Sequence, residues 1–560
     1  MSSVVGITWD DAAPECDRMP DIIRRFQADR DCLERLTALR FSPARLDRMT
    51  RFYREWRRHI DGFPFESMTL ADRADWLLLR QHVETHLRFL RQDRDRFALV
   101  APVIPCAEAL IALNDDRIAM LDVRPEAAAA TLNSVGEAVS SLRQSFRDNT
   151  ITIERQSASF ASQVIRQIQD ALREWFQFYD GYDPMFSWWV EKSFGSAMAS
   201  LDAYAIFLRE HVAGVSGDEV IGLPIGKEAL IAELREAQVH YEPGDLIAAA
   251  KRELIWCRQE FARAARELGV GDSWRDAVEC AKRDYTAPGE QPALVRDLAF
   301  EAIDYVEELD LISVPEVAKQ GWRMDMMSAE KQKINPFFLG GETIIMSYPT
   351  RDMDFEQKLM SLRGNNRAFT RATVQHELIP GHHLQMFSQE RYRPYRQMFY
   401  TPFWIEGWTL HWEMLLWELG FPRTPKERVG MLFWRQHRCL RVIFSLEYHL
   451  GLLTEAECVE MLVCEAGHER ANAVAEVRRS LEADYPPLYQ CAYLIGGMQM
   501  HALHAELVHG GRMSHREFHD AVMKQNCMPI PTLRAVLLGE DLSSEGLPEW
   551  HFLAEEPVPA

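Results

Sequence analysis

The stretch VQHELIPGHHLQ, from Val374 to Gln385, places His376, Glu377, His382 and His383 within eight residues. Imidazole nitrogens are preferred zinc ligands, and a catalytic zinc site takes three protein ligands and leaves a fourth position open. A carboxylate beside such ligands can act as a general base. The stretch therefore predicts two metal ligands and a base in one segment.

The spacing of these histidines requires a break in the helix. In the H-E-x-x-H arrangement the histidines are four residues apart on one helix face, whereas here position i+4 is Pro380. His382 and His383 follow His376 by six and seven residues, and on a regular helix neither spacing brings two imidazoles to one ion. Because proline removes a backbone hydrogen bond and Gly381 tolerates unusual dihedrals, we expect a bulge or kink there. We favour His382 as the second ligand, with His383 as the alternative.

The motif also resembles that of a known family. HELIPGHHLQ is similar to the signature of the bacterial family catalogued as domain of unknown function 885, which itself resembles the helical zinc metallopeptidases. The stretches Trp404 to Gly420, Pro486 to Gly497 and Glu517 to Leu537 are similar to that family's pattern as well. The resemblance covers the C-terminal 200 or so residues well and the N-terminal half loosely. It implies a mostly α, multi-helix, zincin-like fold with a substrate cleft.

The resemblance implies the remaining site residues. Through the family's E-G-W segment, Glu406 is the third zinc ligand, and Glu413 is a reserve ligand or a partner that orients a ligand imidazole. Tyr493, His449 and Tyr485 are candidates to stabilise the oxyanion that forms when water attacks a carbonyl. The cofactor implied is Zn2+.

Two arginines and one strand are candidates for binding substrate. Arg441 and Arg479 could hold the terminal carboxylate of a peptide by bidentate pairing. In the zinc peptidases that this family resembles, an edge strand just before the motif helix pairs with the substrate backbone. ETIIMSY, from Glu342 to Tyr348, is the candidate for that strand. A strand that only stabilises the fold is the alternative.

Helical patterns dominate the rest of the chain. Thr69 opens a capping box before one long amphipathic helix, and a second helix is expected from an N-cap at Asp245 to Gly269. Composition shifts near residue 311, where short β-type runs predict a small hairpin or sheet beside the motif helix. We therefore expect a helical scaffold domain over residues 1–310 and a zinc-binding catalytic domain over residues 311–560. His501, His504, His515 and His519 are expected to be surface or core residues.

Charge and composition limit the partners. The chain carries 63 basic against 84 acidic residues, a net charge of −21, which argues against wholesale binding to nucleic acid or an anionic membrane. The N-terminus does not have the pattern of a signal peptide, and the ten cysteines are scattered, so a cytoplasmic protein with reduced thiols is expected. Nothing in the sequence decides between a monomer and a homodimer.

The sequence thus predicts a zinc-dependent hydrolase, specifically a metallopeptidase of the oligopeptidase or carboxypeptidase type. Its substrate would be a short peptide or a small amide, attacked by zinc-bound water with the help of Glu377. Two alternatives remain open. One is a zinc amidase or hydrolase of a small non-peptide metabolite, and the other is a catalytically inert helical binding protein.

Overall fold

The computed structural model describes residues 18–215, 219–332, 337–482 and 485–553, and it is mostly helical with one small sheet, as predicted. Contacts divide the chain into two compact units, Met1–Ser216 and Gly217–Ala560. The division falls after Ser216 rather than near residue 310, so the helices between residues 226 and 308 pack with the C-terminal unit. None of the described helices is both long and apolar enough to cross a lipid bilayer.

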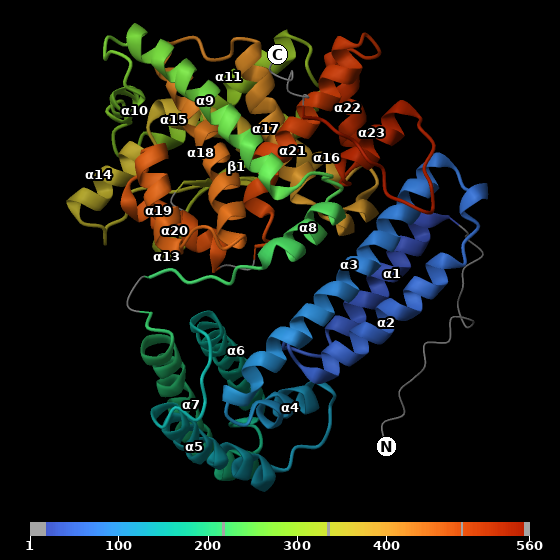
Figure 1. The fold of residues 1–560 in the computed structure, drawn as a ribbon, viewed down its shortest axis with the longest axis vertical. Helices are drawn as coiled ribbons and strands as arrows, with labels where there is room; N and C mark the ends of the chain where they lie inside the picture. The colour runs from blue at the N-terminus through green and yellow to red at the C-terminus, as the bar shows by residue number, and fades with distance from the viewer. Residues whose placement is uncertain (1–17, 216–218, 333–336, 483–484, 554–560) are drawn as a thin grey trace. The chain divides into compact units, whose positions relative to one another are not determined.

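The N-terminal unit consists of helices with recognisable start signals. Thr69 accepts a hydrogen bond from the backbone N–H of Asp72 and caps the longest of them, as the capping-box pattern predicts. Figure 1 shows α1, α2 and α3 running side by side in blue. The helices are α1 (Met19–Glu34), α2 (Pro43–Asp61), α3 (Leu70–Val100), α4 (Ala107–Ile118), α5 (Pro125–Arg147), α6 (Arg155–Tyr179) and α7 (Pro184–Phe207).

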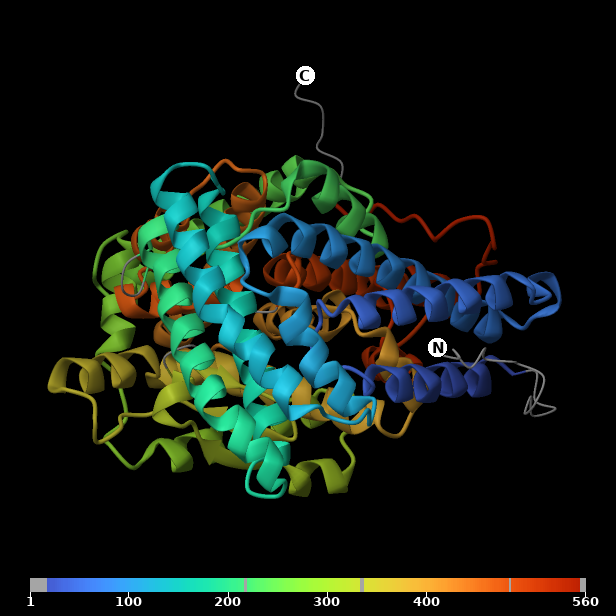
Figure 2. The ribbon, with the colours of Figure 1, turned by 90° about the horizontal axis from the view of Figure 1, so that it is seen from below.

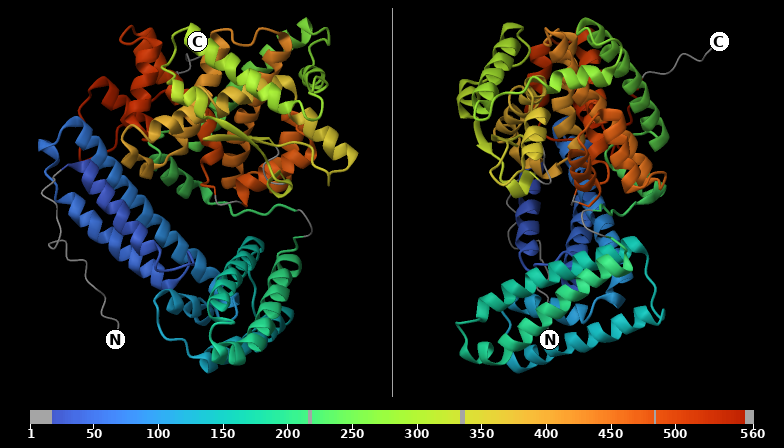
Figure 3. Two further views of the ribbon diagram at one scale, coloured as in Figure 1. Left: turned by 180° about the vertical axis from the view of Figure 1, so that it is seen from behind. Right: turned by 90° about the vertical axis from the view of Figure 1, so that its left-hand side faces the viewer.

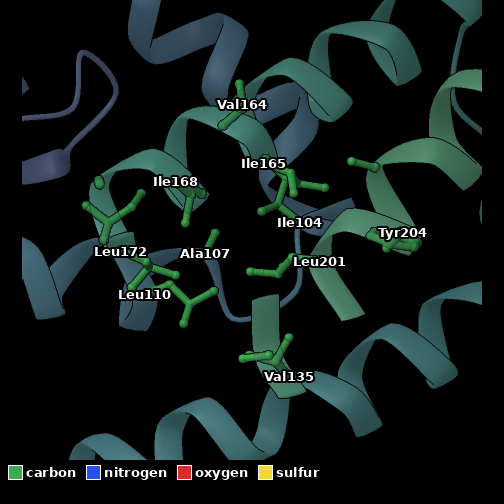
Figure 4. Close-up of a cluster of buried hydrophobic side chains, with 14 of the residues drawn as sticks. Ile104, Ala107, Leu110, Val135, Val164, Ile165, Ile168, Leu172, Leu201 and Tyr204 are labelled. Atoms are coloured by element: carbon green, nitrogen blue, oxygen red, sulfur yellow. The ribbon is translucent and has the colours of Figure 1, made fainter. Parts of the chain in front are cut away.

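The largest apolar core of this unit lies among α4, α5, α6 and α7 (Figure 4). Ile165, Ile168 and Leu172 recur at three- and four-residue steps along α6, and all three are buried. They share this core with Val135 of α5 and Leu201 of α7, and α7 packs against both α5 and α6 (Figure 2, teal to green). The amphipathic stripe of each helix therefore accounts for the packing, and the core gathers apolar side chains rather than reactive groups.

The C-terminal unit holds the motif, and its longest helices surround the motif helices. Helix α18 packs against α9 and α15, and α17 packs against α21. The helices are α8 (Gly226–Glu236), α9 (Pro243–Glu267), α10 (Trp274–Lys282), α11 (Gln291–Glu308), α12 (Glu316–Gly321), α13 (Ala329–Gln332), α14 (Phe355–Gly364), α15 (Arg367–Glu377), α16 (His382–Gln389), α17 (Pro402–Glu418), α18 (Pro425–His449), α19 (Glu455–Met461), α20 (Arg470–Leu481), α21 (Tyr489–His504), α22 (His515–Gln525) and α23 (Ile530–Leu538).

Helix α9 differs slightly from its predicted start. It begins at Pro243, and Asp245 is the third helical residue rather than the N-cap. The Asp245 side chain accepts a hydrogen bond from the backbone N–H of Glu242, which is the true N-cap. Gly269 follows the helix with a φ of 76°, as a C-terminal glycine should. The sequence pattern correctly predicted the helix, but the proline at the first helical position places the N-cap three residues earlier.

Helices α17 and α21 approach closely through glycines. A Cβ added at Gly407 would lie 2.6 Å from the backbone carbonyl carbon of Gly496, and a Cβ at Gly496 would overlap the carbonyl oxygen of Phe403. Only glycine allows the two backbones to lie this close. The contact fixes the two helices that carry much of the chemistry described below.

The sheet has the strand order β1-β3-β2, with β1 (Arg323–Met326), β2 (Phe338–Leu339) and β3 (Thr343–Met346). Strand β3 pairs with β1 in parallel and with β2 antiparallel (Figure 3, yellow-green). The strand predicted from ETIIMSY is therefore the central one, and it is not an edge available to a substrate. Strand β2, which is next to α15, lies at the edge of the sheet instead.

Candidate metal centre

The motif splits into two helices at the position where the sequence predicts a break. Helix α15 ends at Glu377 and α16 begins at His382, and the Ile379–Pro380 peptide bond between them is cis. A Cβ at Gly381 would overlap the carbonyl oxygen of His376, so glycine is required here. The turn folds back onto the end of α15 and carries His382 toward His376.

His376 and His382 face one carboxylate oxygen. Their rings are 5.0 Å apart between centroids and nearly perpendicular, at 85°. Nε2 of His376 lies 3.7 Å from Oε2 of Glu406, and Nε2 of His382 lies 3.3 Å from the same oxygen. Atoms bound to a tetrahedral zinc ion at about 2.0 to 2.1 Å are themselves separated by about 3.3 to 3.5 Å. The two distances to Oε2 of Glu406 are therefore close to those between ligands of one zinc ion.

Both imidazoles are oriented by a hydrogen bond from the other ring nitrogen. Nδ1–H of His376 donates to Oε1 of Glu413 over 2.7 Å, and Nδ1–H of His382 donates to Oε1 of Gln385 over 3.2 Å. Each bond leaves the lone pair of Nε2 directed at the centre. Partners of this kind hold the tautomer and the ring orientation of metal-binding histidines.

Glu406 is held in the same way. It is buried on α17, and the hydroxyl of Tyr489 donates a hydrogen bond to its Oε1 over 2.6 Å. Its Oε2, which faces the two imidazoles, has no hydrogen-bond partner in the described part of the chain. A buried carboxylate oxygen that has ion-pair contacts but no hydrogen bond still needs a balancing positive charge, which a cation at the centre would supply.

The electrostatics of the centre favour a positive charge. Burial lowers the pKa of the His376 imidazole, but its contacts with Glu406 and Glu413 outweigh burial and raise that pKa to about 9. Burial raises the pKa of the Glu406 carboxyl, yet His382 and His376 beside it hold the pKa well below its usual range. Without an ion, the site therefore keeps a proton on His376 at neutral pH, and a metal would take the place of that proton.

Glu377 lies beside the centre and lines the same cavity as its three donor residues. One of its carboxylate oxygens is within 4.8 Å of a ring nitrogen of both His376 and His382. A Cβ added at Gly340, just after β2, would overlap Oε2 of Glu377, so the glycine leaves room for this carboxylate. Only 8% of Glu377 is exposed, and that surface faces the cavity.

A cavity of about 360 Å³ opens onto the centre, within the size range of small-ligand sites of roughly 300 to 1,000 Å³. Its wall combines the motif, the end of β2 and residues from α18, α20 and α21. The lining residues with a charged group or a hydroxyl are Thr373, His376, Glu377, His382, Tyr400, Glu406, Arg438, Arg441, Glu476, Arg479, Tyr485, Tyr489 and Tyr493. Three arginines are among them, one of which, Arg441, pairs with Glu476.

The structure places several predicted residues outside the centre. The ring nitrogens of His383 lie against the carbonyl oxygens of Gly341 and Ala318, at 3.3 Å and 3.0 Å, so this histidine does not face Glu406. Tyr348 follows the central strand β3 and is not among the cavity-lining residues. The strand edge that meets the cavity belongs to β2 and its neighbours, Phe337 to Gly340.

Most of the residues predicted to stabilise the oxyanion or to bind substrate line the cavity, but one does not. Tyr493, Tyr485, Arg441 and Arg479 line the cavity, whereas His449 does not. His449 ends α18, eight residues beyond Arg441 and so about 12 Å further along the helix axis. The sequence pattern placed His449 on the same helix as Arg441, but it did not show that only the middle of α18 lines the cavity.

Two positioning residues were not predicted from the sequence. Gln385, on α16, orients His382, and its Nε2 also donates to the carbonyl oxygen of Ile405 over 3.2 Å. Tyr489 orients Glu406 from α21. Gln385 follows His382 by three residues on one helix and could have been found from that spacing. Tyr489 could not, because it reaches Glu406 across a helix pair.

A family model and two solved structures are similar to this chain. The family model described as "Bacterial protein of unknown function (DUF885)" matches residues 30–537. No curated protein matches the sequence. A solved structure from Shewanella oneidensis, described as a "putative lipoprotein of unknown function", is 16% identical with a TM-score of 0.70, over 94% of this chain and 100% of that one. A "putative lipoprotein" from Colwellia psychrerythraea is 13% identical with a TM-score of 0.59, over 93% and 97%.

These likenesses show the fold, and they correct one expectation. Both matched structures are of proteins described as putative lipoproteins, a description that disagrees with the cytoplasmic location expected from the sequence. The cytoplasmic location inferred from the N-terminal residues and the scattered cysteines is therefore wrong. Neither the charge pattern of the first residues nor the thiol count carried enough information about the compartment.

Proposed function

The chain belongs to the bacterial DUF885 family, whose function is unknown, and we propose that it is a zinc-dependent hydrolase of the metallopeptidase type. The observation that carries the proposal is the convergence of His376, His382 and Glu406. Their donor atoms meet at distances suited to one ion, and Oε2 of Glu406 is buried without a hydrogen-bond partner among the described residues.

The donor set is that of a catalytic zinc site. Two imidazole nitrogens and one carboxylate oxygen supply three ligands, which leaves a fourth position open toward the cavity. A zinc ion bound there would lower the pKa of a coordinated water and polarise a substrate carbonyl. Glu413 and Gln385 hold the imidazoles, and Tyr489 holds the carboxylate.

Glu377 is the general base in this proposal. It is adjacent to His376, its carboxylate lies beside the donor atoms, and it lines the cavity from which a substrate would approach. The carboxylate accepts a proton from the attacking water and passes it to the nitrogen of the leaving group. Its narrow exposure keeps this transfer away from bulk water.

Tyr493 is the donor best placed for the developing oxyanion. Its ring stacks near His376, with 6.3 Å between centroids, and the guanidinium groups of Arg438 and Arg441 lie 4.7 and 4.6 Å from its ring centre. Burial, and then the charge of Glu406, raise the pKa of the Tyr493 phenol to about 12. The hydroxyl therefore stays protonated at neutral pH and can donate a hydrogen bond.

Arg479 is the preferred group for a substrate carboxylate. Arg441 is already committed, because its Nε donates to Oε1 of Glu476 over 2.6 Å. Nε of Arg479 is buried without a hydrogen-bond partner in the described ranges, and its guanidinium lies over the ring of Tyr485 at 5.0 Å. A cationic group in the wall of a small cavity suits the C-terminal carboxylate of a short peptide.

Short peptides with a free C-terminus should be cleaved faster than the same peptides with an amidated end. Arg479→Met should lower kcat/KM for the free peptides by about 10- to 100-fold, since a hydrogen bond to a charged group contributes about 1.5 to 3 kcal/mol. The amidated peptides should lose little. Arg478→Met is the matched control, because Arg478 pairs with Glu482, 3.4 Å away on the same helix. Initial rates on paired peptides measure both effects.

Two results would contradict parts of this proposal. Equal cleavage of free and amidated peptides by the wild type would show that Arg479 does not bind the C-terminal carboxylate of the substrate. Hydrolysis of small N-acyl amides without cleavage of any peptide would replace the peptidase by an amidase that uses the same centre.

A further inference from the structure

A second group of histidines lies on α17, α21 and α22. His411, His504 and His519 are each fully buried, with 0% of the residue exposed. One ring nitrogen from each lies within 4.8 Å of one ring nitrogen from both others. Two of these residues were expected to be ordinary surface or core histidines, but the fold brings them together from segments far apart in the sequence.

The rings of His411 and His519 are joined by a hydrogen bond, whose nitrogen atoms lie closer together than the roughly 3.3 to 3.5 Å between two ligands of one zinc ion, so an ion would separate them slightly. Nε2 of His411 lies 3.0 Å from Nε2 of His519. Nδ1–H of His519 donates to the carbonyl oxygen of Leu311 over 2.7 Å, so its Nε2 carries a lone pair directed at His411. A backbone carbonyl that fixes the tautomer in this way is the usual support of a metal-binding imidazole.

The third member completes the group from another side. The His504 ring lies 5.1 Å from the His411 ring and 5.5 Å from the His519 ring, between centroids. His515 holds it in place, with 2.9 Å between Nε2 of His504 and Nδ1 of His515. The three imidazoles therefore surround one small volume, and each is carried by a different helix.

Two nitrogen atoms in this group lack partners. Nδ1 of His411 and Nδ1 of His504 are buried and have no hydrogen-bond partner among the residues that the structure describes. An unpaired buried polar atom costs free energy, and two in one cluster call for a compensating ligand. A cation that accepts imidazole lone pairs would reorganise the cluster and compensate that cost.

The surroundings keep the imidazoles neutral. The ring of Trp412 stacks on His519 with 4.3 Å between centroids, and Trp408 and Phe518 meet the same imidazole nearly at right angles. Burial lowers the pKa of His519 to about 3 and that of His411 well below its usual range. Neutral imidazole is the form that binds metals.

We propose that His411, His504 and His519 bind a second metal ion, a divalent transition metal such as zinc, at a site separate from the proposed catalytic centre. Imidazole donors suit zinc and its neighbours rather than magnesium or calcium. The ion would join α17, α21 and α22 and so act as a structural brace. Because Nε1 of Trp408 also donates to the carbonyl oxygen of Pro380 over 2.9 Å, the brace would support the motif turn.

The test is the zinc content of the full chain after removal of metal with a chelator, exposure to excess zinc and removal of unbound ion. Wild type should hold two zinc ions per chain, His376→Ala one, and His411→Gln one. The combined variant should hold none. His468→Gln is the matched control. This buried histidine belongs to neither group, and its Nε2 lies 2.9 Å from Nδ1 of His437. The variant should keep two zinc ions per chain.

A second measurement does not depend on folding of the cluster variants. Zinc should still raise the thermal unfolding temperature of His376→Ala, whose second site is intact. One zinc per chain in wild type that disappears in His376→Ala would overturn the second site and leave the proposed hydrolase intact. One zinc that survives in His376→Ala but disappears in His411→Gln would support the second site and overturn the catalytic centre. A wild type without zinc would overturn both.

Discussion

Glu377→Gln is expected to lower kcat for peptide hydrolysis by about 10²- to 10⁴-fold, the range that a positioned general base contributes. The substitution keeps the size and the hydrogen-bonding shape of the side chain but removes the group that accepts a proton. Glu377 lies in the wall of the cavity and is not needed to hold the ion, since His376, His382 and Glu406 supply three ligands. Zinc content should therefore equal that of the wild type.

Steady-state rates on one cleaved peptide, measured beside zinc content, check this expectation. Glu390→Gln is a suitable control, because Glu390 follows α16 on the surface and pairs with Arg391. Its rate should match the wild type. A Glu377→Gln enzyme that keeps more than about a tenth of wild-type kcat would assign the proton transfer to another group.

His382→Ala should lose zinc binding, whereas His383→Ala should keep it. The two residues are neighbours, but only Nε2 of His382 faces Glu406, at 3.3 Å. His383 contacts the carbonyl oxygens of Gly341 and Ala318 instead. Since the loss of an outer-shell partner alone costs 10- to 100-fold in metal affinity, loss of a direct ligand should cost more than about 100-fold.

Zinc titration against a competing chelator distinguishes the two variants. His383→Ala should show wild-type affinity with somewhat lower stability, because a buried side chain that bridges α16 to α12 and to the sheet is truncated. The reverse outcome, in which His383→Ala loses zinc and His382→Ala retains it, would exchange the two roles and contradict the geometry of the turn.

The motif and the helical class were accessible from the sequence for clear physical reasons. Pro380 and Gly381 cannot continue a helix in an ordinary way, so a break was predictable from backbone chemistry alone. The direction in which the turn would carry His382 was not, because it depends on the close approach of Gly381 to His376. Local rules predict that a helix stops, whereas tertiary packing decides where the next one points.

Residues that act across helix pairs were the hardest to predict. Tyr489 meets Glu406 only because Gly407 and Gly496 let α17 and α21 pack closely. The position of β3 at the centre of the sheet was equally hidden, since its parallel partner β1 lies earlier in the chain. Helical periodicity gives a buried face but not the neighbour that covers it.

The division of the chain shows the same limit. Composition changes near residue 311 because the sheet begins soon afterwards, at Arg323. Helices α8 to α11 have the same amphipathic pattern as α1 to α7, and nothing in that pattern says with which unit they pack. The contacts assign them to the C-terminal unit, where α9 lies against α18.

The most direct test of the central claim is elemental analysis of zinc in the purified wild type beside His376→Ala and Glu377→Gln. The proposed centre predicts that Glu377→Gln holds as much zinc as the wild type and that His376→Ala holds one ion fewer per chain. Equal zinc in wild type and His376→Ala, or no zinc in the wild type after zinc is supplied, would contradict a metal centre at His376, His382 and Glu406.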